Sequence, residues 1–283
     1  MHALPTLVAL VAALLLTPPI LRHLQAEGFT RENYRGARLP FPGGIAIVAA
    51  GVLAVGFWSG LVRIADLNWF DWAARTDLLY PLGVALLGLI DDLLAGPSRG
   101  WRGHGRAVLG GEFSTGALKA VGSLALALYV AQGVTLDVGE YLLAVALLVL
   151  TTNLFNLFDL RPGRAAKVFL LLGVVLSLIA WHGRYADDFP PLWIVGPLAA
   201  PILVVGFYDL RERTMLGDVG ANLVGAVAGL WLIYALDTTG QLIALAIVLA
   251  ITVYGEFRSL NALIERVPLL RQIDSLGRND AHA

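Results

Sequence analysis

The sequence predicts an all-α membrane protein, a polytopic transmembrane helical bundle with about nine spans. Of its 283 residues, 58% are hydrophobic and only 14% are charged, whereas soluble proteins are about 45–50% apolar and about 25% charged. The hydrophobic core of a water-soluble protein of this size could not bury so much apolar surface, so most of the chain should face hydrocarbon. This composition excludes a soluble enzyme. The net charge of −1 indicates no nucleic-acid partner, and the absence of cysteine excludes disulfides and thiolate metal sites.

A spanning helix requires about 20 largely apolar residues, and nine segments of the sequence approach this length. They cover residues 3–21, 42–62, 77–95, 118–134, 140–160, 167–182, 191–208, 218–236 and 240–257. We expect the first to be a retained helix, because the stretch from Met1 to Leu16 lacks the basic residues that begin a signal peptide. Residues 1–283 are expected to form a single integral membrane domain, whose last part, residues 258–283, is a cytoplasmic tail.

The basic residues predict the orientation. Seventeen of the 20 Lys and Arg fall in one set of loops and only Arg63, Arg75 and Arg184 fall in the other. Cytoplasmic loops carry the excess of positive charge. We therefore expect a multi-pass protein with the N-terminus outside and the C-terminus in the cytoplasm.

Four carboxylates are expected at the cytoplasmic ends of these segments. Asp91 and Asp92 end the third segment, Asp159 closes the fifth and Asp218 opens the eighth. Acids at such depth usually face the bundle interior or mark a functional pathway. The predicted topology brings all four to one side of the membrane, where we expect the functional site.

Magnesium-assisted phosphoryl transfer is the chemistry that suits such a cluster, because Mg²⁺ prefers carboxylates, water and substrate phosphates. Asn153, Asn156 and Asp159 recur every three residues and therefore share one helix face. Gly217 permits close backbone approach beside Asp218. The start of that helix offers backbone N–H groups that suit a phosphate.

Each motif has a simpler explanation when taken alone. A double Asp often marks a solvated helix boundary, the asparagine stripe suits hydrogen bonding between helices, and Gly-Asp-x-Gly is short. The basic residues next to Asp159, which include Arg164, are typical of cytoplasmic loops but could also hold a diphosphate. Asp209 is expected at the interface, paired with Arg211 or Arg213.

In this order the motifs resemble the polyprenyl-phosphate N-acetylhexosamine-1-phosphate transferase superfamily. The resemblance runs from Pro42-Gly43-Gly44 to about residue 229. It implies transfer of a sugar-1-phosphate from a UDP-sugar to a polyprenyl phosphate with release of UMP, in cell wall biogenesis. It further implies Mg²⁺ as cofactor, the bilayer and the two substrates as partners, a homodimer, and a location in a bacterial plasma membrane.

The resemblance also assigns roles to residues. Asp91 and Asp92 match the acidic pair credited with activating the lipid phosphate, and Asp218 matches the magnesium ligand. The residues expected to bind substrates are Lys119, Asn153, Asn156, Asp159, Arg164, Gly217 and Asn222.

Several positions depart from the family pattern. Pro162 stands where a second Asp is expected, and Met215 stands where an aromatic residue usually stacks on uracil. The His-rich stretch near the C-terminus is absent, and nine segments are fewer than the usual ten or more. Two alternatives therefore stay open beside the enzyme: a catalytically silent paralogue that binds a lipid phosphate or a partner, and a proton-coupled lipid or solute transporter.

Overall fold

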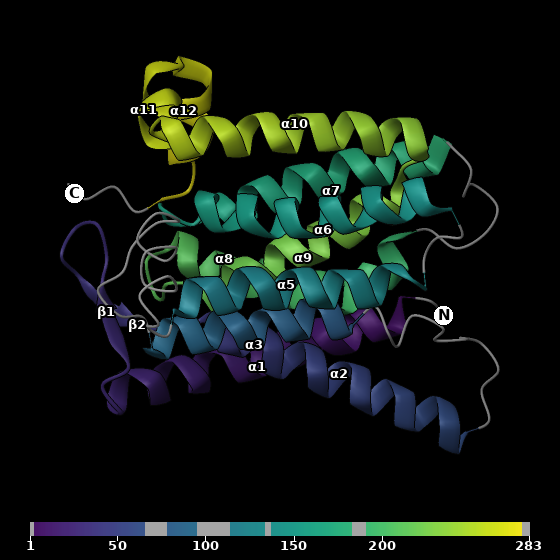
Figure 1. Ribbon diagram of the computed structural model, residues 1–283. Helices are drawn as coiled ribbons and strands as arrows, with labels where there is room; N and C mark the ends of the chain where they lie inside the picture. Colours follow the sequence, from purple (N-terminus) through teal and green to yellow (C-terminus); the bar gives the residue numbers. More distant parts are fainter. Residues whose placement is uncertain (1–2, 66–77, 95–113, 134–136, 183–190, 279–283) are drawn as a thin grey trace.

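The computed structural model describes residues 3–65, 78–94, 114–133, 137–182 and 191–278. In these residues nine long helices form a bundle about a common direction (Figure 1). They are α1 (Leu4–Ala26), α2 (Gly44–Ile64), α3 (Leu79–Leu94), α5 (Thr115–Ala131), α6 (Val138–Phe158), α7 (Arg164–His182), α8 (Pro191–Leu210), α9 (Gly217–Ala235) and α10 (Thr238–Phe257). Each corresponds to one of the apolar segments predicted from the sequence.

The helices fit an all-α membrane protein. Five of them, α1, α2, α6, α9 and α10, are long and apolar enough to cross a bilayer by length and composition. In Figure 1, α1 begins at one end of the bundle and α10 ends at the other, as an odd number of passes requires. The number of spans and their orientation remain predictions.

Four short elements lie at the end of the bundle where α10 finishes (Figure 1). They are β1 (Thr30–Glu32), β2 (Arg38–Pro40), α11 (Leu260–Arg266) and α12 (Pro268–Ser275). The strands pair antiparallel, with Arg31 opposite Leu39. Their turn closes because the Asn33 side chain accepts hydrogen bonds from the backbone N–H groups of Arg35 and Ala37, both at 2.9 Å. The hairpin thereby holds Arg31 beside the helix ends.

Helix α9 is the centre of the bundle. In the most apolar stretch of α9, 89% is buried inside the protein. In the corresponding stretch of α10, which lies at the periphery, only 17% is buried. Glycines allow neighbouring helices to approach α9 closely: a Cβ on Gly225 would lie 2.6 Å from the Cα of Thr152 in α6. Small residues serve this purpose in membrane bundles generally. The beginning of α9, which carries Asp218, is therefore held by main-chain packing on several sides.

Candidate functional site

Lys119 joins two of the predicted site carboxylates. Its ammonium group donates a hydrogen bond to Oδ2 of Asp91 at 2.8 Å and another to Oδ2 of Asp218. The three side chains come from the end of α3, the first turns of α5 and the start of α9. They retain 15–29% of their exposure, so the group is open to a ligand. We call Asp91, Lys119 and Asp218 the lysine cluster.

The local sequence explains how Lys119 reaches this place. Ser114 begins α5 as its N-cap, and its hydroxyl accepts a hydrogen bond from the N–H of Ala117 at 3.2 Å. Lys119 then lies one turn into the helix, at the end of the bundle where α3 finishes. A flexible four-carbon stem lets an ammonium extend between two acids that belong to other helices.

Asp92 differs from its neighbour Asp91. Its side chain is only 2% exposed, and its Oδ2 accepts a hydrogen bond from the N–H of Val219 at 3.0 Å. Helix α9 has no capping side chain of its own, so Asp92 supplies the cap that the free N–H groups require. Arg31 lies nearby, with its Nη1 3.9 Å from Oδ1 of Asp92. The start of α9, expected to receive a phosphate, is thus already occupied by a carboxylate of this chain.

Gly217 has the close backbone approach predicted for it. Its φ of +71° favours glycine, and a Cβ there would lie 2.6 Å from Oδ2 of Asp92 and 2.7 Å from Cβ of Pro42. On the opposite side, a Cβ on Gly88 would lie 2.5 Å from the carbonyl oxygen of Asp218. The backbone around Asp218 is therefore enclosed by α3 and by the segment before α2, which fixes where its carboxylate emerges.

The remaining predicted residues of this end are placed less tightly. Asn153 and Asn156 are half-buried on α6, and Asp159 ends that helix close enough to Asp92 and Asp218 for their charges to interact. Asn222 is buried beside Gly88 of α3, and its amide nitrogen has no hydrogen-bond partner among the described residues. The convergence of the four acids on one end of the bundle is as the topology predicted.

The described residues contain no group of three His, Cys, Asp or Glu side chains arranged to hold a metal ion. The lysine cluster supplies two carboxylates, and Mg²⁺ commonly takes only one or two from the protein. The donor set therefore fits a magnesium ion that completes its shell with water and substrate phosphate.

Arg164 lies in a second polar group and not in the lysine cluster. Its Nε and Nη2 donate to the carboxylate of Asp274 at 2.7 and 3.0 Å, and its Nη1 donates to Oδ1 of Asn261 at 2.6 Å. Its side chain is 5% exposed. The expectation that Arg164 binds a substrate is not supported by this position, because the residue fastens the C-terminal segment to the start of α7.

Lys167 and Arg278 complete this attachment. We call the whole group the C-terminal clasp and define it as Arg164, Lys167, Asn261, Asp274 and Arg278. Lys167 donates to the backbone carbonyls of Ile273, Asp274 and Leu276 at the end of α12. Arg278 pairs with Asp274 at 2.9 Å and donates to the carbonyl oxygen of Pro162. Burial opposes ionisation of Asp274, but the hydrogen bonds and charge of Arg164 outweigh it and lower the pKa of this carboxyl.

Sequence reasoning misplaced Asp209. The expected pairing with Arg211 or Arg213 at the interface is wrong, because Asp209 is buried near the end of α8 with 3% exposure. Its Oδ2 accepts from the N–H of Gly163 at 2.7 Å, and the carboxylate also accepts from the backbone of Leu216. It thus ties the turn after Asp159 to the turn before Asp218. No local pattern signals this role, since both partners are backbone groups distant in sequence.

Comparison with known proteins gives a similar transferase. No family model matches the chain. Over 240 residues, the chain is 27% identical to the phospho-N-acetylmuramoyl-pentapeptide-transferase of Moorella thermoacetica. The aligned region covers 80% of this chain and 73% of that protein. Fold and site thus define a multi-pass, all-α membrane protein, and its relative is a transferase. The name of this relative is consistent with the resemblance found in the motifs, so that resemblance is confirmed.

Proposed function

We propose that this protein transfers a sugar-1-phosphate from a UDP-sugar to a polyprenyl phosphate at the cytoplasmic face of the membrane. The observation that carries the proposal is the lysine cluster, in which three helices bring two carboxylates and one ammonium to a partly open site at one end of the bundle. The name and similarity of the relative support the same class of reaction.

The reaction would proceed by attack of a lipid phosphate oxygen on the β-phosphorus of the nucleotide sugar. The bond from this phosphorus to the bridging oxygen breaks, and the electron pair leaves with UMP. Asp218 and Asp91 would hold Mg²⁺, which when bound supplies positive charge to the diphosphate. Catalysis of phosphoryl transfer rests mainly on positioning and electrostatic stabilisation.

The residues of the chain contribute in different ways. Lys119 offers a fixed positive charge between the two acids, where a diphosphate would approach. Asp92 acts as a positioning residue, because its carboxylate fixes the start of α9 and hence the place of Asp218. Asn153 and Asn156, half-buried on α6, have amide groups that suit hydrogen bonding to the nucleotide.

One observation favours a second candidate, the catalytically silent paralogue. Lys119 already neutralises much of the charge of Asp91 and Asp218, and a lysine so placed can substitute for a metal in holding the fold together. Pro162 and Met215 also replace groups expected to recognise the nucleotide. The transporter is disfavoured because the acids gather at one end of the bundle, whereas carrier sites usually lie near the midplane.

The decisive experiment measures UMP release from candidate UDP-sugars with the purified protein and undecaprenyl phosphate, with and without Mg²⁺. We expect magnesium-dependent release, reduced about 100-fold or more in Asp218→Asn, the scale observed when one key electrostatic contributor is removed. Glu256→Gln is the matched control, because this exposed carboxylate lies at the same end of the bundle outside the lysine cluster.

The outcomes separate the candidates. Release that is equally reduced in Glu256→Gln and Asp218→Asn would contradict the assignment of Asp218. No magnesium-dependent release from any UDP-sugar, by a protein that still binds undecaprenyl phosphate, would establish the silent paralogue.

A further inference from the structure

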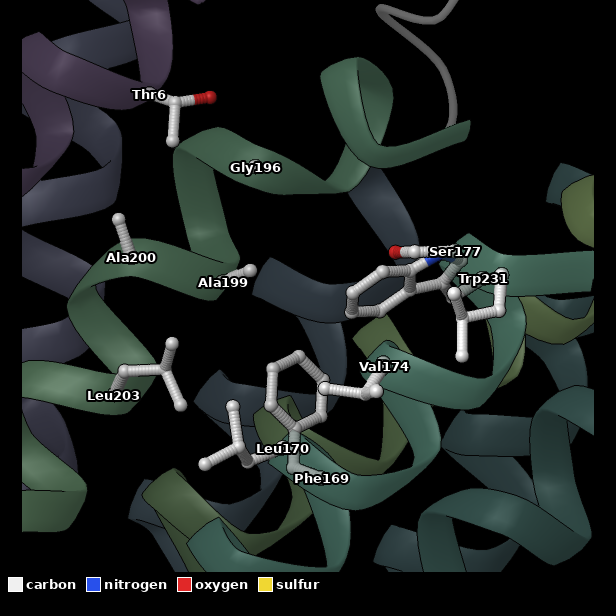
Figure 2. A pocket seen from close by; sticks show the side chains of 12 residues that line it. Thr6, Phe169, Leu170, Val174, Ser177, Gly196, Ala199, Ala200, Leu203 and Trp231 are labelled. Carbon is white, nitrogen blue, oxygen red and sulfur yellow. The ribbon is translucent and has the colours of Figure 1, made fainter. Parts of the chain in front are cut away.

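Two cavities of the protein differ in the character of their walls. The first, of about 370 Å³ between α7, α8 and α9, is lined by apolar side chains such as Leu170, Val174 and Leu203, and no charged side chain is among its described lining residues (Figure 2). The second, of about 440 Å³, lies where α10 ends and α11 begins. Its lining residues are Tyr254, Arg258, Ser259, Ala262 and Arg266. We call the second one the arginine cavity, because its walls carry charge that could select a ligand.

The arginine cavity has an excess of positive charge. Arg258 and Arg266 are both exposed, and neither forms an ion pair within the part of the chain that the structure describes. Glu265, the acid next to Arg266 in the sequence, is instead 3.6 Å from Arg161. Two guanidinium groups at one cavity repel each other, and an anion bound between them adds two attractions. Arginine suits this role because its planar group donates pairs of hydrogen bonds to phosphate.

The position of the arginine cavity along α10 places it at the level of lipid headgroups. Helix α10 has 20 residues, a length of about 30 Å, which is close to the thickness of the hydrocarbon core of a bilayer. Arg258 directly follows Phe257, its last residue, and the side chains of Val253 and Phe257 are exposed at this peripheral helix. A phospholipid whose acyl chain lies along α10 would therefore place its phosphate beside Arg258.

Helix α12 turns an apolar side outward at the same end of the bundle. Leu269, Ile273 and Leu276 follow one another at intervals of four and three residues, so they share one side of the helix, and they are 46–71% exposed. Asp274 lies on a different side, where Arg164 of the C-terminal clasp holds it. The clasp thereby fixes the rotation of α12 and leaves the three apolar side chains exposed. Amphipathic helices of this kind lie at the boundary between headgroups and acyl chains.

Figure 1 shows where these short helices lie. Both α11 and α12 are drawn beside the last turns of α10, on the side away from the rest of the bundle. They are thus lateral to the long helices, where the surface of a bilayer would surround the protein. In this place a lipid headgroup layer would contact the arginine cavity and the apolar side of α12 together.

We propose that α11 and α12 lie in the headgroup layer of the bilayer, where the arginine cavity binds the phosphate of an anionic glycerophospholipid and the apolar side of α12 inserts among the acyl chains. The hydroxyl groups of Tyr254 and Ser259 can donate hydrogen bonds to the same headgroup. A zwitterionic lipid would bring a further cation next to two arginines, so an anionic lipid is favoured. No residue of the lysine cluster lines this cavity, so the site is separate from the proposed transfer reaction.

The first experiment titrates delipidated protein in detergent with phosphatidylglycerol and counts bound lipids by native mass spectrometry. Phosphatidylglycerol should bind more tightly than phosphatidylcholine. Arg258→Gln and Arg266→Gln should each weaken its binding about tenfold, the scale of one hydrogen bond to a charged group. Arg22→Gln is the matched control and should bind like the wild type, because Arg22 is an exposed arginine near the end of α1 that does not line the cavity.

Three results would overturn the lipid site. Equal binding of phosphatidylglycerol and phosphatidylcholine would exclude recognition of the negative charge. Equal losses in Arg22→Gln and Arg258→Gln would show that the binding depends only on the overall charge of the protein. Preferential binding of undecaprenyl phosphate that is lost in Arg266→Gln would overturn the lipid class.

A second experiment measures the depth of α12 in liposomes that contain phosphatidylglycerol. Because the chain has no cysteine, Ile273→Cys and Ser275→Cys can each carry a single nitroxide label, on opposite sides of the helix. The label at position 273 should collide more often with oxygen, which concentrates among acyl chains, and the label at position 275 more often with a water-soluble nickel chelate. Equal access of the nickel chelate to both labels would overturn the insertion of α12.

Discussion

Lys119 and Arg164 both stand near acidic motifs in the sequence, and both were expected to bind substrate. Lys119 bridges Asp91 and Asp218 and remains 20% exposed. Arg164 is 5% exposed, and its guanidinium is engaged by Asp274 and Asn261 of the C-terminal segment. An ammonium shared by two accessible acids can respond to a ligand. A guanidinium whose N–H groups already donate to a carboxylate and to an amide oxygen holds two segments of the protein together.

If Lys119 and Arg164 play the roles just described, the lysine cluster and the C-terminal clasp face the same compartment, the cytoplasm. Reporter fusions that measure membrane topology test this, and their result is all or none. A reporter fused after residue 283 should be cytoplasmic, and one inserted near residue 185 should be outside. The reason is the excess of basic residues in one set of loops. A C-terminal reporter found outside would place the carboxylates away from the compartment that contains nucleotide sugars.

Replacement of Lys119 should have the largest effect on turnover. Lys119→Met removes the charge but retains much of the stem, and UMP release should fall about 100-fold or more. The thermal midpoint should change far less, because the two acids remain accessible to water and to Mg²⁺. If Lys119→Met unfolds the protein but the folded fraction keeps full activity, the lysine is a structural residue like Arg164.

Replacement of Arg164 should act on stability instead. Arg164→Gln removes the bidentate partner of Asp274 and leaves Arg278 as its remaining charged partner, so the loss should be about 2 kcal/mol, the scale of hydrogen bonds to a charged group. The measurement is the thermal midpoint in detergent. Arg161→Gln is the control, because Arg161 makes a 3.6 Å contact with the mostly exposed Glu265 and should lose less than about 1 kcal/mol. A selective loss of substrate affinity in Arg164→Gln, with no loss of stability, would support the prediction from the sequence that Arg164 binds substrate.

Asp209 connects the two regions, so its replacement should affect both. Asp209→Asn keeps the size of the side chain but presents an NH₂ group to one of the two backbone N–H groups of Gly163 and Leu216. A buried donor left unsatisfied costs about 1–3 kcal/mol. We expect a lower thermal midpoint together with a partial loss of UMP release. Wild-type stability in Asp209→Asn would show that the tie between the two turns contributes nothing.

Acid should loosen the clasp, which is the smallest effect expected. Because the pKa of Asp274 is lowered in the folded protein from its usual 3.8, the pair stabilises the fold above that value and loses this contribution as the pH falls below it. The chain has no cysteine, so nitroxide labels at Leu171→Cys and Gln272→Cys report the distance from α7 to α12. The distance distribution should broaden reversibly below pH 3.8, and Arg164→Gln should broaden it already at neutral pH.

The sequence predicted the helices well because the bilayer imposes length and apolarity on each segment separately. It also predicted that Asp91, Asp159 and Asp218 meet at one end, since this follows from the order of the segments. It could not distinguish Asp91 from Asp92, because which of two adjacent carboxylates caps α9 depends on how α3 is rotated against it. Asp209 was misplaced for a similar reason, because its partners lie on segments distant in sequence. The contacts of Arg164 with Asn261 and Asp274 could not be foreseen for the same reason.

The order in which the chain is synthesised determines when each charge of the lysine cluster is added. Helices α3 and α5 are consecutive among the described elements and carry Asp91 and Lys119 at the same end, so they can insert as a hairpin whose two charges cancel. Asp218 follows only after α6, α7 and α8 have been made. The third charge therefore joins a pair that is already neutral, and it leaves the completed cluster with one net negative charge. A nascent chain that stops before α9 would carry a balanced ion pair and no excess charge to attract a cation.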